Sequence, residues 1–223
     1  SRGHIKLNGN LCIAGSFTGS VDLDPTPGIF SVNSNAQSRD AFFVELNSNG
    51  GFVRAYTFGS NSSDLATGVT SNAAGDVYIT GSFWSTADFN PTAGVFNLTS
   101  AGSRDVFVVR MSANGNFIGA HRTGGTGLEF SGDVLLDSQE QVYVSGVFSN
   151  TVDFDPGAGV TNLTSAGGRD LFVQRFSSSF TLDWVRQWGN IFSETIDGTD
   201  VTPDGNVYVT GSFNGTVDFD PGP

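Results

Sequence analysis

Several residue types and patterns are scarce in this 223-residue chain, and each scarcity excludes something. There is one cysteine, Cys12, so no internal disulfide can form and cysteine use does not identify the redox compartment. No apolar run approaches the roughly 18 residues that a membrane span needs. Ten basic residues stand against 22 acidic ones, and the net charge of −12 argues against nucleic acid and anionic membranes as partners.

Catalytic constellations are also lacking in the sequence. His4 and His121 do not have zinc-ligand spacing with each other or with Cys12. No serine has a plausible His/Asp set, and no Walker or Rossmann loop is present. Cys12 falls in an expected strand, which favours a buried structural thiol. No segment has a sustained 3.6-residue apolar period, so the sequence predicts an all-β fold.

What the chain does contain is a tandem repeat. The stretch Val152-Asp153-Phe154-Asp155-Pro156-Gly157 has three counterparts, whose first aspartates are Asp22, Asp88 and Asp218, at spacings of 66, 65 and 65 residues. A fixed period of this kind indicates a propeller, solenoid or array.

The chain starts without Met and partway through a repeat, so we expect a piece of a longer protein from which a signal peptide has been removed. The repeats are 1–20 (partial), 21–86, 87–151, 152–216 and 217–223 (partial).

Each repeat reads as four main strands joined by turns. The first strand is weak, as at 67–71, whereas the second is β-branched and aromatic and bounded by turn residues. Predicted second strands are 77–83, 142–148 and 207–213, third strands are 41–46, 106–111 and 171–176, and fourth strands are 52–58, 117–122 and 182–188.

Four such strands form one antiparallel blade of a β-propeller. About three and a half blades are present, fewer than the roughly four of a small closed propeller, so we expect an arc of a larger propeller or closure by another chain. A linear β-solenoid is the alternative, and it fits less well because its repeats are shorter.

The repeat phrases resemble a known family. Gly205 to Phe213 (Gly-Asn-Val-Tyr-Val-Thr-Gly-Ser-Phe), Thr151 to Gly157, Asn162 to Gly167 and the Arg-Asp-x-Phe-Val phrase are similar to SBBP-type repeats. These are β-propeller repeats of large secreted or surface-attached bacterial proteins. The resemblance covers nearly the whole chain and implies a propeller in an extracellular setting. It implies no reaction and supplies no catalytic residues.

Acidic residues are expected to gather on one rim. In an up-and-down blade the second-to-third and fourth-to-first connections share a rim. The first of these connections carries Asp-x-Asp-Pro and Arg-Asp, and the second carries Asp64, Glu129 or Glu194. The Arg-Asp pairs, which favour an ion pair or a clamp between blades over a ligand site, are Arg39/Asp40, Arg104/Asp105 and Arg169/Asp170.

The Asp-x-Asp-Pro motif has two interpretations. Residues i and i+2 of extended backbone point the same way, so two carboxylates could converge on Ca²⁺. Alternatively, the side chains cap backbone N–H groups in an Asx-turn. The candidate calcium ligands are Asp22, Asp24, Asp88, Asn90, Asp153, Asp155, Asp218 and Asp220, with the Asn90 site weakest.

The leading functional hypothesis is a non-enzymatic propeller at the bacterial cell surface, used for adhesion or protein interaction and stabilised by Ca²⁺ if the Asp-x-Asp-Pro motif binds it. Its working surface is the rim at 18–40, 84–105 and 149–170, where we expect long polar loops outside the sheets. Expected partners are a protein or glycan at the cell surface and further repeats of the same or another chain. The alternatives are a carbohydrate-binding propeller, in which Trp84 could stack on sugars, and a polysaccharide-degrading glycosidase or lyase using the rim carboxylates. Near-identical acidic positions in every repeat argue against the enzyme.

Overall fold

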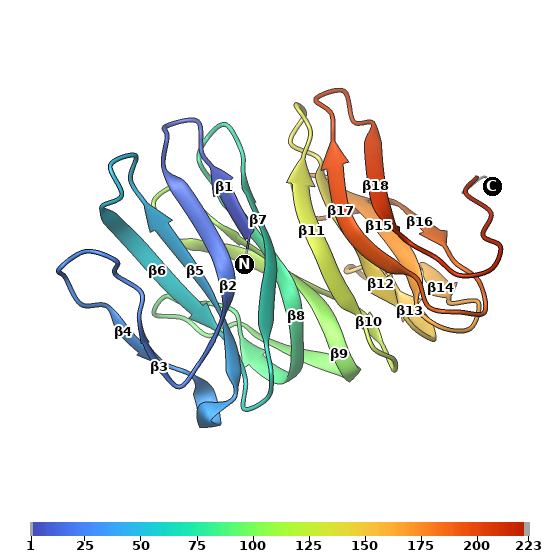
Figure 1. Cartoon of the computed structure of the whole chain (residues 1–223), viewed down its shortest axis with the longest axis horizontal. Helices are drawn as coiled ribbons and strands as arrows, with labels where there is room; N and C mark the ends of the chain where they lie inside the picture. Colours follow the sequence, from blue (N-terminus) through green and yellow to red (C-terminus); the bar gives the residue numbers. More distant parts are fainter. Residues whose placement is uncertain (1, 221–223) are drawn as a thin grey trace. The chain divides into compact units, whose positions relative to one another are not determined.

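The computed structural model describes residues 2–220, and it is an all-β structure (Figure 1). Apart from one short 3-10 turn at Asn35–Gln37, its regular elements are strands. No helix in the described part of the chain is long and apolar enough to cross a membrane. The chain divides into two compact units, one made of residues up to 99 with 107–120 and the other of 100–106 with residues from 121 onward.

The first unit contains two sheets. In each of them, the four main strands lie side by side in the order in which they follow one another along the chain. The first sheet has the order β1-β2-β5-β6, with β1 (Arg2–Ile5), β2 (Leu11–Thr18), β5 (Arg39–Leu46) and β6 (Phe52–Phe58). The next has the order β7-β8-β9-β10, with β7 (Leu65–Ser71), β8 (Val77–Asp88), β9 (Asn97–Met111) and β10 (Phe117–Gly125), the last two continuing into the second unit. Strand β7 packs against β1, β2 and β5, so the two sheets stack face to face.

The second unit repeats this arrangement. Its antiparallel sheet has the order β11-β12-β15-β16, with β11 (Phe130–Leu136), β12 (Val142–Phe148), β15 (Asp170–Phe176) and β16 (Leu182–Trp188). Strand β17 (Thr195–Val201) packs on that sheet and pairs with β18 (Val207–Ser212). The predicted strands 52–58, 142–148 and 182–188 are confirmed, since they coincide with β6, β12 and β16.

The hairpin turns between the first two strands depend on a left-handed backbone position. Gly75 and Gly205 hold it with φ of 90° and 87°, a conformation that glycine adopts without steric cost. The corresponding turn at 137–141 has no glycine, and Glu140 takes the position instead with φ of 59°. The turn therefore forms in this repeat although Glu140 replaces the usual glycine.

The long second-to-third connections were expected to be loops outside the sheets, and this was wrong. They contain hairpins, formed by β3 (Ser20–Asp22) with β4 (Ser31–Asn33) and by β13 (Thr151–Asp153) with β14 (Asn162–Thr164). Strand β13 also pairs with the end of β10, which adds the hairpin to the edge of the preceding sheet. In the same way β8 extends to Asp88, beyond its predicted end at residue 83, and β9 begins at Asn97 rather than 106. Pairing with an exposed sheet edge satisfies the backbone groups of these segments, which the local sequence does not reveal.

Aromatic side chains fill the core between strands of one repeat. Phe83, Phe89 and Phe107 are at most 1% exposed and their rings lie 4.7 to 6.3 Å apart. Phe148, Phe154 and Phe172 form the equivalent cluster in the second unit, with ring separations of 5.1 to 6.2 Å. The Asp-x-Asp-Pro motif contributes one ring to each cluster, because the residue between its two polar positions is Phe89 or Phe154.

Candidate functional site

The first aspartate of each Asp-x-Asp-Pro motif caps its own loop. In the first hairpin, Asp22 Oδ1 accepts hydrogen bonds from the N–H groups of Asp24 (3.0 Å) and Phe30 (2.8 Å). Asp88 and Asp153 bind the equivalent N–H groups, two and eight residues further along, at 2.8 to 3.1 Å. Each carboxylate thus fixes both ends of the loop that joins the two hairpin strands.

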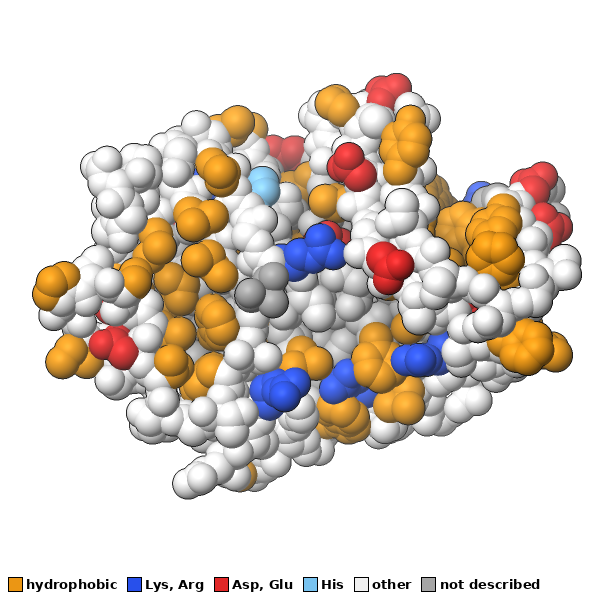
Figure 2. Space-filling view, viewed as in Figure 1, with side chains coloured by type: hydrophobic (Ala, Val, Ile, Leu, Met, Phe, Trp, Pro, Cys, Tyr) orange, Lys and Arg blue, Asp and Glu red, His pale blue; other side chains and the backbone are white. Residues whose placement is uncertain are grey.

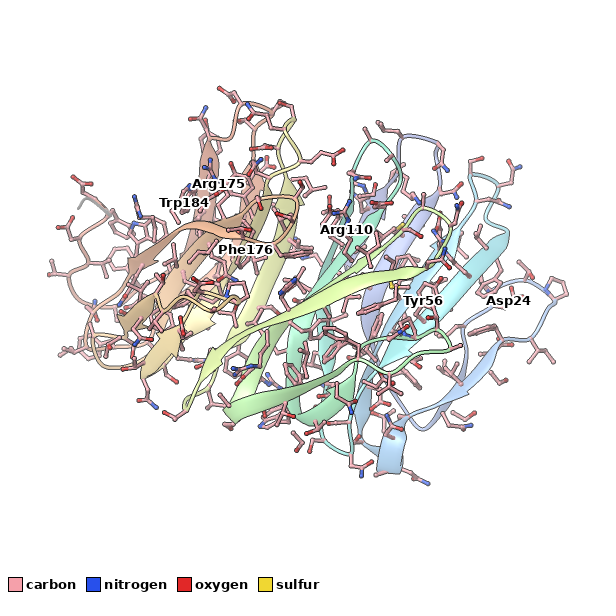
Figure 3. The ribbon with its side chains drawn as sticks, turned by 180° about the vertical axis from the view of Figure 1, so that it is seen from behind. Asp24, Tyr56, Arg110, Arg175, Phe176 and Trp184 are labelled. Carbon is pink, nitrogen blue, oxygen red and sulfur yellow. The ribbon has the colours of Figure 1, made fainter. Side chains whose placement is uncertain are left out.

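The second polar position caps the next turn. Asp24, which lies in the loop between β3 and β4 (Figure 3), accepts hydrogen bonds from Thr26 N (2.8 Å) and Thr26 Oγ1 (2.7 Å). Asn90 accepts the same pair from Thr92 at 3.0 and 2.6 Å, and Asp155 accepts one from Gly157 N. Because an amide oxygen replaces the carboxylate at Asn90 without loss of the contacts, the shared role at this position needs no charge.

These contacts are those of an Asx-turn. Among residues 2–220, no three His, Cys, Asp or Glu side chains come together as a metal-ion group. The calcium hypothesis therefore stays a prediction, resting on the eight residues named from the sequence.

We expect the capping role to appear as a stability difference between two variants of Asp153. Asp153→Ala removes the acceptor for two backbone N–H groups and should lower the free energy of unfolding by about 2 kcal/mol, at about 1 kcal/mol per hydrogen bond. Asp153→Asn keeps the acceptor and should cost less than half as much. Urea denaturation measures both, and equal losses would contradict the capping role.

A second experiment, thermal unfolding with and without calcium, tests the calcium hypothesis. A ligand that binds only the native state raises the melting temperature. If the motif binds Ca²⁺, millimolar calcium raises the melting temperature of the wild type, and the double variant Asp153→Asn/Asp155→Asn loses part of that rise. A wild type that does not respond to calcium would contradict the hypothesis.

The acidic residues of the fourth-to-first connections are buried beside the Arg-Asp pairs. Their backbone N–H groups donate to an arginine carbonyl: Asp64 to Arg39 (2.6 Å), Glu129 to Arg104 (2.9 Å) and Glu194 to Arg169 (2.8 Å). Their exposed fractions are 0 to 1%. The expectation that the two connections meet at one end of the strands is confirmed within each repeat, and the clamp between them is a main-chain hydrogen bond.

The aspartates of the Arg-Asp pairs cap the loops that precede their strands. Asp105 Oδ2 accepts a hydrogen bond from Ala101 N (2.8 Å) and forms an ion pair with Arg122. Asp170 Oδ2 accepts from Ala166 N (3.0 Å) and from Gln187 Nε2 (2.6 Å). These carboxyl groups lie against the glycine that ends each fourth strand, so a Cβ atom at Gly124 would be 2.2 Å from Asp105 Cγ.

The buried carboxyl groups hold their protons more tightly than usual. Burial, with repulsion from Asp105, raises the pKa of Glu129 to about 7, although hydrogen bonds oppose this. Burial likewise raises the pKa of Asp105 and Asp170. A raised carboxyl pKa is one signature of a catalytic acid. However, Asp105 and Glu129 are both 0% exposed, so a substrate cannot reach them in this conformation.

Two arginines of the Arg-Asp pairs, Arg104 and Arg169, stack on an aromatic ring, and the ion-pair partner of Asp105 is Arg122. The guanidinium carbons of Arg104 and Arg169 lie 4.5 and 5.2 Å from the ring centroid of Phe130. Cation–π contacts of this kind stabilise desolvated arginines.

Cys12 is 0% exposed, and burial raises its thiol pKa to about 12, which confirms a buried thiol that is protonated at neutral pH.

A set of exposed aliphatic side chains lies at the loop tips, and it was not predicted from the sequence. Ile29, Val95 and Val160 occupy the equivalent position in three repeats and are 81, 74 and 71% exposed. Each follows a glycine, and that recurrence was the available signal. The residue after each tip donates its backbone N–H to the first aspartate of the motif, so the motif fixes the backbone beside each tip. Figure 2 shows that hydrophobic side chains reach the surface at many places on the viewed face.

Comparisons with known proteins give a distant similarity. No family model matches this chain. The chain is similar to an uncharacterized WD repeat-containing protein of Acanthamoeba polyphaga mimivirus, at 23% identity over 131 residues. The match covers 55% of this chain and 9% of that protein.

Proposed function

We propose that the chain is a non-enzymatic β-propeller segment that binds other molecules at the bacterial cell surface. Support for the propeller comes from the repeated four-strand sheets, from their face-to-face stacking within each unit and from the similarity to a WD repeat-containing protein. The extracellular setting rests on the resemblance of the repeats to SBBP-type sequences.

The repeat length is compatible with this proposal. WD repeats are about 40–45 residues long, whereas this period is near 65 residues. The connection between β2 and β5, residues 19–38, accounts for the difference, since it contributes about 20 residues to a hairpin outside the four main strands. Four strands without that hairpin match the length of a WD repeat.

The observation that carries the binding function is the repeated presentation of one aliphatic side chain by a capped loop. The acidic residues of the motif fix the loop, and Ile29, Val95 and Val160 point their exposed side chains away from the core. Burying such a side chain in a partner stabilises the complex by about 1.5–3 kcal/mol. Each contact is therefore weak, and equivalent tips on one chain provide avidity.

We expect the loop tips to control binding to intact bacterial cells. Fluorescently labelled chain is added to cells and bound fluorescence is measured by flow cytometry. The triple variant Ile29→Ser/Val95→Ser/Val160→Ser should lose more than about 100-fold in apparent affinity, and each single variant should lose much less. Val53→Ser/Ile118→Ser is the matched control, because these two residues are also exposed but lie on strands β6 and β10.

Two results would contradict the proposal. One is equal binding by the wild type and the triple variant. The other is turnover of a polysaccharide or peptide substrate that disappears in Glu129→Ala while the variant remains folded. The second result would favour a glycosidase or lyase that uses the acidic residues.

A further inference from the structure

The chain contains a single lysine, Lys6, and its side chain is only 5% exposed. Lys6 lies at the start of the turn between β1 and β2, and Asn10 lies at the end of that turn. The N–H of Lys6 donates to the carbonyl of Asn10 at 2.8 Å, so the two residues face each other across the hairpin. Lysine is almost never buried without a partner, so the groups around this amine indicate what it does.

One carboxylate oxygen contacts the side chains of both residues. Glu45 Oε1 accepts a hydrogen bond from Lys6 Nζ at 3.2 Å and another from Asn10 Nδ2 at 2.8 Å. The amine and the amide therefore lie next to each other around a single oxygen atom. The second oxygen, Oε2, pairs with Arg54 at 2.5 Å, which leaves Oε1 to the other two groups.

The cluster is closed to solvent, and all of its groups belong to the first unit. Glu45 is 2% exposed, and its cross-strand neighbour Cys12 is 0% exposed. The turn between β7 and β8 covers the amine, since a Cβ atom on Gly75 would be 3.7 Å from Lys6 Nζ. A site that excludes water protects an amide from hydrolysis, and an amine held beside that amide reacts with it more readily.

Glu45 has the charge that a general base needs. Burial opposes its ionisation, but hydrogen bonds from Asn10 and the charge of Arg54 outweigh burial and lower the pKa of Glu45. The carboxylate is therefore ionised at neutral pH and lies within hydrogen-bond reach of a proton on Lys6 Nζ. A lysine that has given up this proton is a nucleophile.

The balance of charge in the cluster also favours a reaction. Two cations, Lys6 and Arg54, pair with the single carboxylate of Glu45, so these three groups carry one excess positive charge in a buried site. An uncompensated buried charge is destabilising. Converting the amine of Lys6 into a neutral amide removes that charge and leaves Glu45 paired with Arg54.

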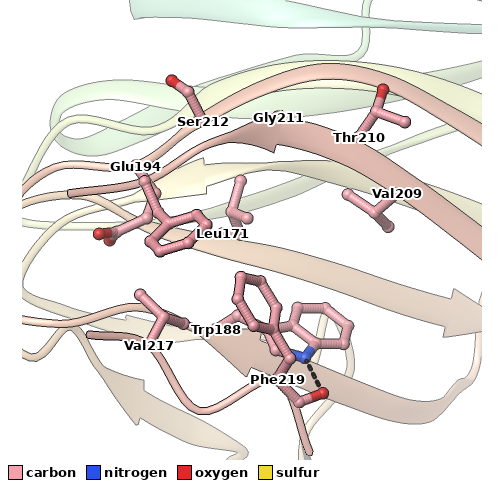
Figure 4. Close-up of a pocket in the computed structure, with 10 residues that line it drawn as sticks. Leu171, Trp188, Glu194, Val209, Thr210, Gly211, Ser212, Val217 and Phe219 are labelled. Carbon is pink, nitrogen blue, oxygen red and sulfur yellow. Dashed lines mark hydrogen bonds between the residues drawn. The ribbon is translucent and has the colours of Figure 1, made fainter. Parts of the chain in front are cut away.

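A buried carboxyl group alone does not make such a site. Glu194 is 0% exposed and lines a cavity of about 320 Å³ together with Trp188 and Phe219 (Figure 4). Among the described residues that line this cavity there is no lysine and no asparagine. The cluster at Glu45 differs because an amine and a primary amide contact the same carboxylate.

We propose that Lys6 and Asn10 form an intramolecular amide bond, with Glu45 as the catalytic residue. Glu45 Oε1 takes a proton from the ammonium group of Lys6, and the neutral amine attacks Cγ of Asn10. The Nζ–Cγ bond forms, and the Cγ–Nδ2 bond breaks when Glu45 passes the proton to Nδ2. The leaving nitrogen takes a second proton from Nζ and departs as an ammonium ion, so atoms and charge balance without an oxidant or reductant. This modification does not depend on the loop tips or on a binding partner.

Mass spectrometry of the intact chain tests the bond directly. We expect a mass lower than the value calculated from the sequence by one ammonia molecule. Because Lys6 is the only lysine, trypsin should leave residues 3–39 as one peptide, since it does not cleave after an amidated lysine. An amine-reactive label should not modify Lys6 even in denaturant.

Variants separate the covalent bond from an ordinary ion pair. Lys6→Arg keeps the charge beside Glu45 but has no primary amine, so it should have its full calculated mass. Glu45→Gln cannot accept the proton, and the bond should form at least about 100-fold more slowly. Asn10→Asp should lose water instead of ammonia. Asn49→Ala changes an exposed asparagine in the turn between β5 and β6 and should leave the loss of ammonia unchanged.

Three outcomes would overturn the proposal. The first is a folded wild type that keeps its full calculated mass after prolonged incubation at mildly alkaline pH and that trypsin cleaves after Lys6. The second is a loss of ammonia that persists in Lys6→Arg, because a succinimide would then account for the lost mass. The third is bond formation in Glu45→Gln at the rate of the wild type.

Discussion

Gly124→Ala is expected to lower the free energy of unfolding by about 3 kcal/mol, the upper part of the range for an added methyl group in a packed site. The new Cβ would lie 2.2 to 2.6 Å from the carboxyl atoms of Asp105. That carboxyl group cannot move aside, because it is 0% exposed and held by Ala101 N and Arg122. Urea denaturation measures the loss.

Gly119→Ala is the matched control for this variant. Gly119 lies in the same strand, β10, and a Cβ added there meets nothing within 4 Å. Its effect should stay within about 0.5 kcal/mol or be stabilising. In an Asp105→Ala background the cost of Gly124→Ala should fall below about 1 kcal/mol, since contacting residues give non-additive effects. An equal cost in both backgrounds would place the clash elsewhere.

Glu129→Gln is expected to stabilise the protein at pH 8 and to leave its stability nearly unchanged at pH 4.5. The pKa of Glu129 is raised from 4.5 to about 7 in the folded state, so the folded state binds the proton more tightly than the unfolded state. Stability from this group is present below pH 4.5 and is lost as the pH rises to about 7. The total loss is at most about 3 kcal/mol, at 1.36 kcal/mol for each pH unit.

The neutral amide that Glu129→Gln introduces cannot ionise, so the variant escapes that loss. Urea denaturation from pH 4.5 to pH 8 should show a difference from the wild type that grows with pH. Glu45→Gln provides a control of opposite sign. Burial opposes ionisation of Glu45, but hydrogen bonds from Asn10 and the charge of Arg54 outweigh it and lower its pKa. The stability that Glu45 contributes is fully present above its unfolded pKa of 4.5 and is lost as the pH falls below that value, so Glu45→Gln should be less stable than the wild type by a nearly constant amount above about pH 5.5. A difference for Glu45→Gln that grows together with that of Glu129→Gln up to pH 8 would contradict the assignment.

The local parts of this structure could be read from the sequence. The strands at 52–58, 142–148 and 182–188 were predictable because β-branched and aromatic residues are bounded by turn residues. The Asx-turns were predictable as well, since Asp153 binds N–H groups at most eight residues away. The choice between a cap and a calcium ligand stayed open, because both use the same carboxylate oxygens.

The parts that the sequence could not supply depend on segments far apart in the chain. In the hairpin at 151–164, one side of β13 pairs with its local partner β14, and the other side pairs with the end of β10, which satisfies backbone groups that have no local partner.

The sequence by itself determined the 65-residue period, the strand order and the recurrence of acidic residues at equivalent positions. These follow from local propensity and spacing, which each repeat carries within itself. The tertiary structure decided that Asp105 and Glu129, 24 residues apart, are both buried, Asp105 against Gly124 and Glu129 as the acceptor of a hydrogen bond from Gly125 N. Burial of a charge depends on every segment packed around it, so the sequence could place these acidic residues in the connections at one rim but could not show that their carboxyl groups are buried.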